Sequence, residues 1–330
     1  MRASIVIRTL NEGRYLGDLL VLIKQQVTQG IEIETVLIDS GSDDDTVDIA
    51  KRHGARITHI PKAKFSFGRS LNWGSDFATG DILVYISAHC MPVNPQWLQT
   101  LCQPLIDGHA AYSYGRQIGD NSSNYSERRV FAKYFSDRSE IPQDGFFCNN
   151  ANSALLRSAW AAHPFNEELT GLEDMELAKR LTEAGGKIAY VAEAPVFHHH
   201  QESWAQIRRR FEREALALRA IMPEIQLSAF DVLRCVVAST VGDWRAAMRN
   251  GVSSTSRRDM LRYRWNQYLG SYKGNHENRR LSQSAKERFF YPQPNEKALN
   301  DDWLGPLHRA SPHEGQQPEG EGQEFPASAR

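Results

Sequence analysis

The fold is decided by residues 4–53, which read SIVIRTLNEGRYLGDLLVLIKQQVTQGIEIETVLIDSGSDDDTVDIAKRH. Two short β-branched runs, at 4–8 and 33–38, each end in a polar turn that leads into an apolar-periodic stretch. This order predicts strand, helix, strand, helix. Strands that alternate with helices form doubly wound, mostly parallel sheets, and the ligand sites of such sheets lie beyond the carboxyl ends of the strands.

The same alternation continues toward the carboxyl terminus and then becomes irregular. The expected elements are strands at 56–60, 82–86, 111–116 and 187–191, and helices at 68–78, from 158, and at 173–184, 203–221 and 229–248. Residues 119–145 are expected to form a mobile loop. We predict an α/β domain over residues 1–200, a helical basic region over 201–291, and a disordered tail over 292–330 that ends in GQQPEGEGQEFPASAR.

Composition indicates a globular protein, because 41% of the 330 residues are hydrophobic and 24% are charged. Four widely spaced cysteines without a CxxC pair favour a reduced, cytoplasmic compartment. The amino terminus enters a strand pattern at once, and no uncharged apolar run is long enough to span a membrane, so we expect neither a signal peptide nor a transmembrane helix. A net charge of -1 and the lack of a recognition motif argue against nucleic-acid binding.

Charge is distributed unevenly along the carboxyl-terminal part. Residues 201–290 contain 17 Lys and Arg against 9 Asp and Glu, whereas residues 291–330 contain 3 against 7. The amphipathic, arginine-bearing helices at 203–221 and 228–249 suit peripheral binding to the inner face of the plasma membrane, where a polyprenyl-linked acceptor would be presented. Packing on the α/β domain, or on a second subunit in a homodimer, explains the same pattern equally well.

Five separated motifs, in order, resemble the family 2 glycosyltransferases over roughly residues 3–215. They are VIRTLNEGRYL (6–16), VLIDSGSDDDT (36–46), FSFGRSLNWGSDFATGDILVYI (65–86), CNNANSALLRSAW (148–160) and PFNEELTGLEDMELAKRL (164–181). Within the family, FSFGRSLN is most similar to rhamnosyltransferase-type members that build bacterial surface polysaccharides such as O-antigen or capsule. The resemblance implies a GT-A fold and inverting transfer from a nucleotide-sugar donor to a hydroxyl of a polysaccharide or lipid-linked glycan.

The pair Glu173–Asp174 is predicted to be catalytic. It begins an expected helix, where the helix dipole and free N–H groups favour an ionised carboxylate. Inversion at a sugar carbon needs a base that takes the proton of the attacking hydroxyl. The resemblance implies that this base is Asp174.

The donor is expected to lie at the strand ends. Asp39 and Ser40 end the second strand and would contact the nucleotide, and Arg8 and Glu12 flank the end of the first strand. Arg69 and Asn72 share one helix face by their i, i+3 spacing, and both are expected to point toward the donor, with helix capping as the alternative. On the acceptor side, we expect Asn150 and Asn152, which alternate on an extended stretch, and Trp204.

The strand at 82–86 ends in Ser87-Ala88-His89-Cys90, where the family usually has an acidic pair that binds Mg²⁺ or Mn²⁺. Imidazole is a poorer ligand than carboxylate for magnesium, so the usual metal arrangement is in doubt. In one interpretation His89 and a histidine of the run 198–200, taken as His199, bind manganese or another transition ion. In the other, no metal binds, and positive groups such as His89, Arg69 and Arg116 offset the charge of the departing phosphate beside Ser87, as would suit a CMP-activated sugar acid. A degenerate, non-catalytic glycan- or nucleotide-binding module is a third alternative.

Overall fold

The structure is a computed structural model that describes residues 1–119, 123–200, 202–252 and 255–276. All of the described residues belong to one compact unit. The tail predicted at 292–330 lies outside the described residues.

An eight-stranded mixed sheet forms the centre of the described part of this unit, in the order β3-β2-β1-β4-β7-β6-β8-β5. Its strands are β1 (Arg2–Thr9), β2 (Glu32–Asp39), β3 (Arg56–His59), β4 (Ile82–Ser87), β5 (Cys90–Pro92), β6 (Tyr112–Gly119), β7 (Asn152–Leu156) and β8 (Ile188–His198). The strands β1 to β4 pair in parallel, as do β6 and β8. Only β7 and β5 run antiparallel to their neighbours. The predicted α/β class with a mostly parallel sheet is confirmed.

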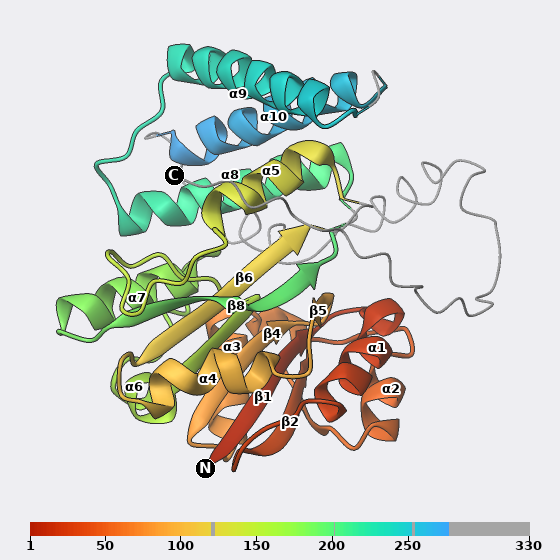
Figure 1. Ribbon diagram of the computed structural model, residues 1–330, viewed down its shortest axis with the longest axis vertical. Coiled ribbons are helices and arrows are strands. Elements are labelled where there is room, and N and C mark those ends of the chain that lie inside the picture. The colour runs from red at the N-terminus through yellow and green to blue at the C-terminus, as the bar shows by residue number, and fades with distance from the viewer. Residues whose placement is uncertain (120–122, 201, 253–254, 277–330) are drawn as a thin grey trace, which may run out of the picture. The chain divides into compact units, whose positions relative to one another are not determined.

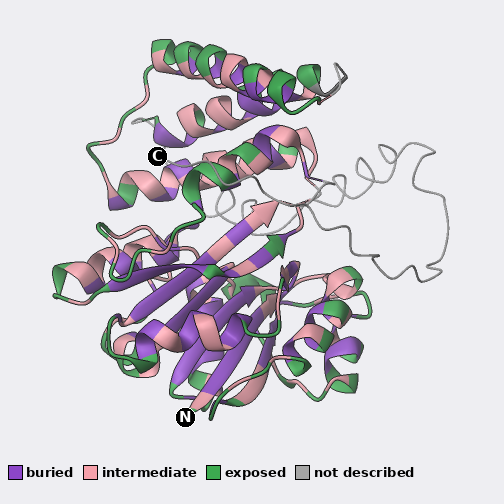
Figure 2. Ribbon diagram, viewed as in Figure 1, coloured by how far each residue is buried: buried purple, intermediate pink, exposed green. Residues whose placement is uncertain are grey.

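Two hydrophobic cores lie on the two faces of this sheet, because alternate residues of a strand point to opposite sides. In β1, Ile5 and Ile7 belong to one core, whereas Val6 belongs to the other. The first core includes residues of α1 (Gly13–Lys24), α2 (Thr46–Arg52) and α4 (Trp97–Ile106). The second includes residues of α3 (Phe67–Phe77), α6 (Arg157–Ala162) and α7 (Glu173–Glu183). The strands are therefore buried on both faces, as the continuous apolar runs in the sequence predict (Figure 2).

A stack of helices lies beyond the ends of β6 and β8 (Figure 1). It contains α5 (Tyr125–Tyr134), α8 (Trp204–Ile221), α9 (Ala229–Arg249) and α10 (Thr255–Asn275). The helix α10 lies against α8, α9 and α5. No helix in the part of the chain that the structure describes is long and apolar enough to cross a membrane.

Several elements differ from the sequence-based expectation. The segment 119–145, expected to be a mobile loop, contains α5, and the strand expected at 187–191 continues to His198. The elements α4, β5 and β7 were not predicted, and α10 lies within the region 201–291, which was expected to be helical without a defined helix at this position. The strands β5 and β7 are three and five residues long, so neither leaves a long apolar run in the sequence.

Candidate active site

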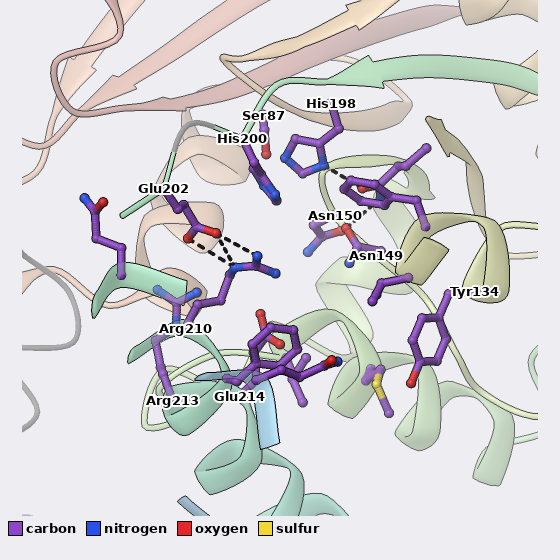
Figure 3. A pocket seen from close by; sticks show the side chains of 18 of the residues that line it. Ser87, Tyr134, Asn149, Asn150, His198, His200, Glu202, Arg210, Arg213 and Glu214 are labelled. Atoms are coloured by element: carbon purple, nitrogen blue, oxygen red, sulfur yellow. Dashed lines mark hydrogen bonds and ion pairs between the residues drawn. The ribbon is translucent and has the colours of Figure 1, made fainter. Parts of the chain in front are cut away.

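A large cavity of about 1700 Å³ opens at the carboxyl ends of β1 and β4 and extends between α5, α8, α9 and α10. Its wall on the sheet side includes Arg8, Ser40, Ser87 and Asn150. On the helical side, charged groups of α8 project toward it, among them Arg210 (Figure 3). Pockets that hold small ligands usually measure about 300 to 1,000 Å³, so this cavity has room for two substrates.

Three histidines meet at the junction of the sheet and the helices. His89, His198 and His200 each offer one ring nitrogen, and these nitrogens all lie within 4.8 Å of one another. The ring centroids of His198 and His200 are 4.0 Å apart, and those of His89 and His198 are 5.1 Å apart. A cluster of this kind has the donor set of a metal site.

Each of the three rings is held by a separate partner at Nδ1. The partner oxygen belongs to Glu12 for His89, at 3.1 Å. It belongs to Gln117 for His198, at 2.7 Å, and to Glu127 for His200, at 2.8 Å. A hydrogen bond at one ring nitrogen fixes the tautomer and leaves the other nitrogen, Nε2, as the ligand atom.

His198 is the most buried member of the cluster, with 7% of its surface exposed. Its Nε2 is buried and has no hydrogen-bond partner. Burial lowers the pKa of His198 well below its usual value, and the neighbouring His200 and His89 add to this effect. The ring is therefore neutral at pH 7, which is the form that binds metals.

The structure corrects the choice of His199 as the metal-binding histidine. Residues two apart point to the same side of an extended chain, so His198 and His200 face the cluster together and His199 faces away. The ring of His199 also borders the cavity but stacks on Tyr15, with centroids 5.4 Å apart.

A network of charged side chains extends the histidine cluster into α8. Arg210 donates to Glu127 at 2.6 Å and pairs with Glu202 at 2.6 Å. Glu127 therefore joins a guanidinium of α8 to the ring of His200. Arg213, one turn further along α8, lines the cavity and lies over the ring of Phe67 at 4.6 Å.

The predicted catalytic pair lies at the start of α7, directly behind the cavity wall. The oxygens of Asp174 accept hydrogen bonds from the backbone N–H groups of Asn150 and Met175, both at 2.8 Å. Burial, and then the adjacent Glu173, raise the pKa of Asp174 to about 7. Glu173 instead pairs with Arg8, with Oε1 and Nη1 3.2 Å apart.

Two residues that line the cavity have a left-handed backbone conformation. Leu172, which precedes α7, has a φ of 55°, and Asn11, after β1, has a φ of 58°. Both residues line the cavity. Non-glycine residues in the left-handed region are held there by their surroundings and cluster at functional sites.

Four of the predicted donor-binding residues, Arg8, Glu12, Ser40 and Ser87, line the cavity together with His89. Asp39 does not. Its carboxylate accepts hydrogen bonds from the N–H groups of Gly41 and Ser42 and from the hydroxyl of Ser42, and so closes the turn after β2. The carboxylate oxygens of Asp39, which were expected to accept hydrogen bonds from a nucleotide, thus accept them from the turn itself.

Arg69 and Asn72 share one helix face, as their spacing predicts, but that face does not border the cavity. Both bind Glu167: Arg69 through Nε at 2.6 Å and Asn72 through Nδ2 at 3.0 Å. Asn72 also accepts from Trp160 and from the N–H of Phe165, so its amide is fully used. The structure gives these two side chains a role in fixing the segment 165–167 against α3.

The three residues expected on the acceptor side separate in the structure. Asn150 lines the cavity, and its Nδ2 is buried without a partner. Asn152 is fully buried and bonds to Trp97, to the carbonyl of Arg116 and to that of Ala194, so it cannot contact a substrate. Trp204 lies outside the cavity lining, with Arg262 over its ring at 4.9 Å.

Sequence reasoning missed much of the helical side of the site. The missed residues are Gln117, Glu127, Glu202, Arg210 and Arg213, and within the named run 198–200 the wrong histidine was chosen. A usable signal existed for His198 and His200, because a strand that continues to residue 198 places residues 198 and 200 on one side. Glu127 carried no signal, because its helix falls in a segment that reads as a loop.

Comparison with known proteins agrees with this arrangement. Residues 4–162 match the model of glycosyl transferase family 2. The chain carries a family 2 glycosyltransferase domain. The predicted family and enzyme class are therefore confirmed.

Several curated glycosyltransferases resemble the chain in sequence. The O-antigen chain rhamnosyltransferase RfbN of Salmonella typhimurium is 27% identical over 219 residues, which are 61% of this chain and 67% of RfbN. The O-antigen chain rhamnosyltransferase WbaN of Salmonella anatum is 29% identical over 191 residues, which are 54% of this chain and 60% of WbaN. The predicted similarity to rhamnosyltransferase-type members is thus confirmed, although the chain spans only about two thirds or less of these relatives.

Solved glycosyltransferase structures share the fold. The mannosyltransferase PcManGT from Pyrobaculum calidifontis, in complex with GDP-Man and Mn²⁺, superposes with a TM-score of 0.57 at 15% identity and covers 82% of this chain and 86% of its own. Glucosyl-3-phosphoglycerate synthase from Mycobacterium tuberculosis, in complex with phosphoglyceric acid, superposes with a TM-score of 0.51 at 20% identity and covers 66% and 78%. These neighbours confirm the GT-A type of fold.

Proposed function

We propose that the chain transfers a sugar from a nucleotide-sugar donor to a hydroxyl of a polysaccharide or lipid-linked glycan, with inversion at the anomeric carbon. The family 2 domain supports transfer from a nucleotide sugar. The names of RfbN and WbaN support an O-antigen-type polysaccharide as the product. The single observation that carries the proposal is the Glu173–Asp174 pair behind the cavity wall. This pair lies outside the family 2 match at residues 4–162 but beside a cavity that the matched part lines.

Asp174 is the proposed general base. The acceptor oxygen forms a bond to the anomeric carbon, the bond from that carbon to the phosphate oxygen breaks, and the hydroxyl proton passes to the carboxylate of Asp174. A base works best when its pKa is close to the working pH, and burial raises the pKa of Asp174 to about 7. Because the cavity is lined by Leu172 and Met175 but not by Asp174, the acceptor hydroxyl must reach the carboxylate between these two residues.

Glu173 has a different proposed role. Its ion pair with Arg8 supports a function in holding that arginine at the cavity wall rather than in taking a proton. Arg8, Glu12, Ser40 and Ser87 border the strand ends, where a doubly wound sheet binds a nucleotide. Asn150, whose Nδ2 has no partner, is the proposed hydrogen-bond donor to the acceptor.

A matched pair of variants in a sugar-transfer assay distinguishes the proposed roles of Asp174 and Glu173. Asp174→Asn preserves the shape and one of the two oxygens that accept from Asn150 and Met175, but removes the base, so kcat should fall about 10²- to 10⁴-fold. Glu173→Gln should chiefly affect donor binding through Arg8. Near wild-type turnover in Asp174→Asn would refute the assignment of the base.

The nucleotide is identified by thermal-shift titration with UDP, dTDP, GDP and CMP, because a ligand of the folded state raises the melting temperature. Stabilisation by a nucleoside diphosphate supports a diphosphate-sugar donor. Stabilisation by CMP alone would instead support the alternative of a CMP-activated sugar acid, which the absence of acidic residues at 87–90 favours.

A further inference from the structure

We propose that His89, His198 and His200 form a binding site for a single divalent transition-metal ion such as Zn²⁺ or Co²⁺. His89 lies in the turn between β4 and β5, His198 ends β8, and His200 follows it. The antiparallel pairing of β5 with β8 brings these segments together. The neighbouring backbone is joined as well, because the N–H of His199 donates to the carbonyl of His89 at 3.1 Å. The three rings are thus fixed relative to one another by the sheet.

The strongest argument is the state of the ring nitrogens. Every Nδ1 has a hydrogen-bond partner, so the remaining nitrogen of each ring is the one free to bind an ion. The Nε2 of His198 is buried without any partner. A buried polar atom without a partner destabilises the fold, and a bound cation would supply the missing partner.

Ligand chemistry determines which ion fits. Magnesium prefers six oxygen ligands, and among these three residues there is no carboxylate. Imidazole suits zinc, cobalt, nickel, copper and iron, and affinity for a nitrogen site increases from manganese through cobalt toward copper. We therefore expect zinc and cobalt to bind more tightly than manganese, and magnesium not to compete.

The site replaces the acidic pair that family 2 enzymes usually have, so this assignment deepens the proposed function. A cation bound there would offset negative charge on the departing phosphate of the donor. Glu12, Gln117 and Glu127 would act as positioning residues, because each orients one ring through Nδ1.

Cobalt binding provides a test that does not depend on sugar transfer. The full-length protein, stripped with chelator, is titrated with Co²⁺ and followed by its visible absorption and by calorimetry. We expect one ion per chain, displaced by Zn²⁺ but not by Mg²⁺. The absence of a stoichiometric cobalt spectrum in the folded wild-type protein would overturn the proposal, whatever the variants do.

The run of histidines supplies its own control. His198→Ala and His200→Ala should each weaken cobalt binding at least 100-fold, whereas His199→Ala should change it less than threefold. Gln117→Ala should weaken it about 10- to 100-fold by releasing the ring of His198. Equal losses in His198→Ala and His199→Ala would overturn the site. Cobalt binding without any sugar transfer would leave the site intact and refute the proposed function instead.

A second inference comes from an independent feature, the outer face of α9. Four large apolar side chains are exposed there: Phe230 by 73%, Leu233 by 57%, Val237 by 54% and Met248 by 58%. At 3.6 residues per turn, the spacings of 3, 7 and 18 residues from Phe230 place all four on one side of the helix. The opposite side, with Val232, Val236 and Ala247, is buried (Figure 2).

Arginines follow one edge of this apolar stripe. Arg234, Arg245 and Arg249 are exposed. Arg234 pairs with Asp231 of the same helix at 3.3 Å, whereas Asp243 is buried in an ion pair with Arg264. We infer that this face binds an anionic lipid bilayer, with the apolar stripe in the headgroup region and the arginines against lipid phosphates. A second copy of the chain fits less well, because a twofold interface would bring the same arginines together.

The position of α9 relative to the cavity connects this surface with the proposed function. Cys235, Ser239 and Gly242 of the same helix line the cavity. A lipid-linked acceptor held in the bilayer would thus meet the cavity beside α9.

Vesicle sedimentation tests the surface without sugar transfer. We expect the full chain to bind vesicles that contain phosphatidylglycerol more tightly than vesicles of phosphatidylcholine alone, and the binding to weaken with salt. Leu233→Glu with Val237→Glu should reduce binding at least tenfold, and each Arg→Gln change at 234, 245 or 249 about fivefold. Val21→Glu is the matched control, because Val21 is an exposed valine on the distant helix α1, and it should change binding less than twofold.

Three results would overturn this inference. They are equal binding to neutral and anionic vesicles, equal loss in the Val21 control, and a dimer in solution that the Leu233 and Val237 substitutions dissociate. Vesicle binding by a chain that transfers no sugar would refute the proposed function and leave the surface intact.

Discussion

The helices α8 and α9 have similar amphipathic patterns and opposite environments. Both are long, amphipathic and rich in arginine, and the sequence predicts the same membrane-facing role for each. In the structure, Arg210 of α8 is paired with Glu127 and Glu202 beside the cavity, whereas the arginines of α9 are exposed. An amphipathic pattern thus shows that a helix has two faces, but the carboxylates on neighbouring elements decide which face is inside.

The largest expected difference between the two helices is in stability. Arg210→Met should lower the free energy of unfolding by about 3 kcal/mol, because the buried Glu127 and the half-buried Glu202 would both lose the guanidinium, and Glu127 would keep only His200. Arg245→Met on α9 should change it by no more than about 0.5 kcal/mol. Urea unfolding of the full chain measures both, and equal effects would remove the distinction between the helices.

Two carboxylates, Glu34 and Asp174, also differ in their surroundings, and their pKa values shift in opposite directions. Burial opposes ionisation of Glu34, but hydrogen bonds from Ser4, Thr79 and Arg56 lower its pKa to about 2. Burial, and then the adjacent Glu173, raise the pKa of Asp174 to about 7. The folded state therefore binds a proton at Asp174 more tightly than the unfolded state does, so this residue destabilises the fold above pH 7 and does so less as the pH falls toward 4.

Comparison of wild type with Asp174→Asn isolates that contribution. From pH 7 to pH 5, the free energy of unfolding of the wild type should increase relative to the variant, by no more than about 3 kcal/mol. Glu34 acts in the opposite direction, since its contribution is present above pH 4 and is lost as the pH falls toward 2. A pH difference between wild type and Asp174→Asn with the reverse sign would contradict the raised pKa.

The smallest expected effect distinguishes the two faces of α9 itself. Val236 is 3% exposed and Val237 is 54% exposed, so the same substitution at adjacent positions has different consequences. Val236→Ala should cost about 1.5 kcal/mol of stability through lost burial, whereas Val237→Ala should cost almost nothing. A similar loss at both positions, measured by urea unfolding, would mean that the outer face of α9 is covered.

The sheet side of the molecule was more predictable than the helical side for a physical reason. Buried parallel strands require continuous apolar runs such as ILVYI at 82–86, and these are visible in the sequence. The short antiparallel strand β7 and the helix α5 are specified by contacts with distant segments, which leave little local signal.

The sequence predicted the cavity-lining residues at the ends of strands correctly. It predicted less well the residues whose side-chain direction depends on packing against distant segments. Arg8, Glu12, Ser40, Ser87 and His89 all border the cavity as their positions at strand ends indicate. Asn72 lies on the expected face of its helix, but Phe165 and Glu167 bind it there. No local sequence pattern indicates this contact. The histidine pair was misassigned by one residue because the end of β8 was placed seven residues too early.

The most direct test of the account is the stereochemistry of the product. The chain is incubated with UDP-, dTDP-, GDP- and CMP-activated sugars and a lipid-linked glycan acceptor, and the anomeric proton is followed by NMR. The account predicts release of the nucleotide and one product whose anomeric configuration is opposite to that of the donor. A product with retained configuration, or no consumption of any donor by the folded protein, would contradict it.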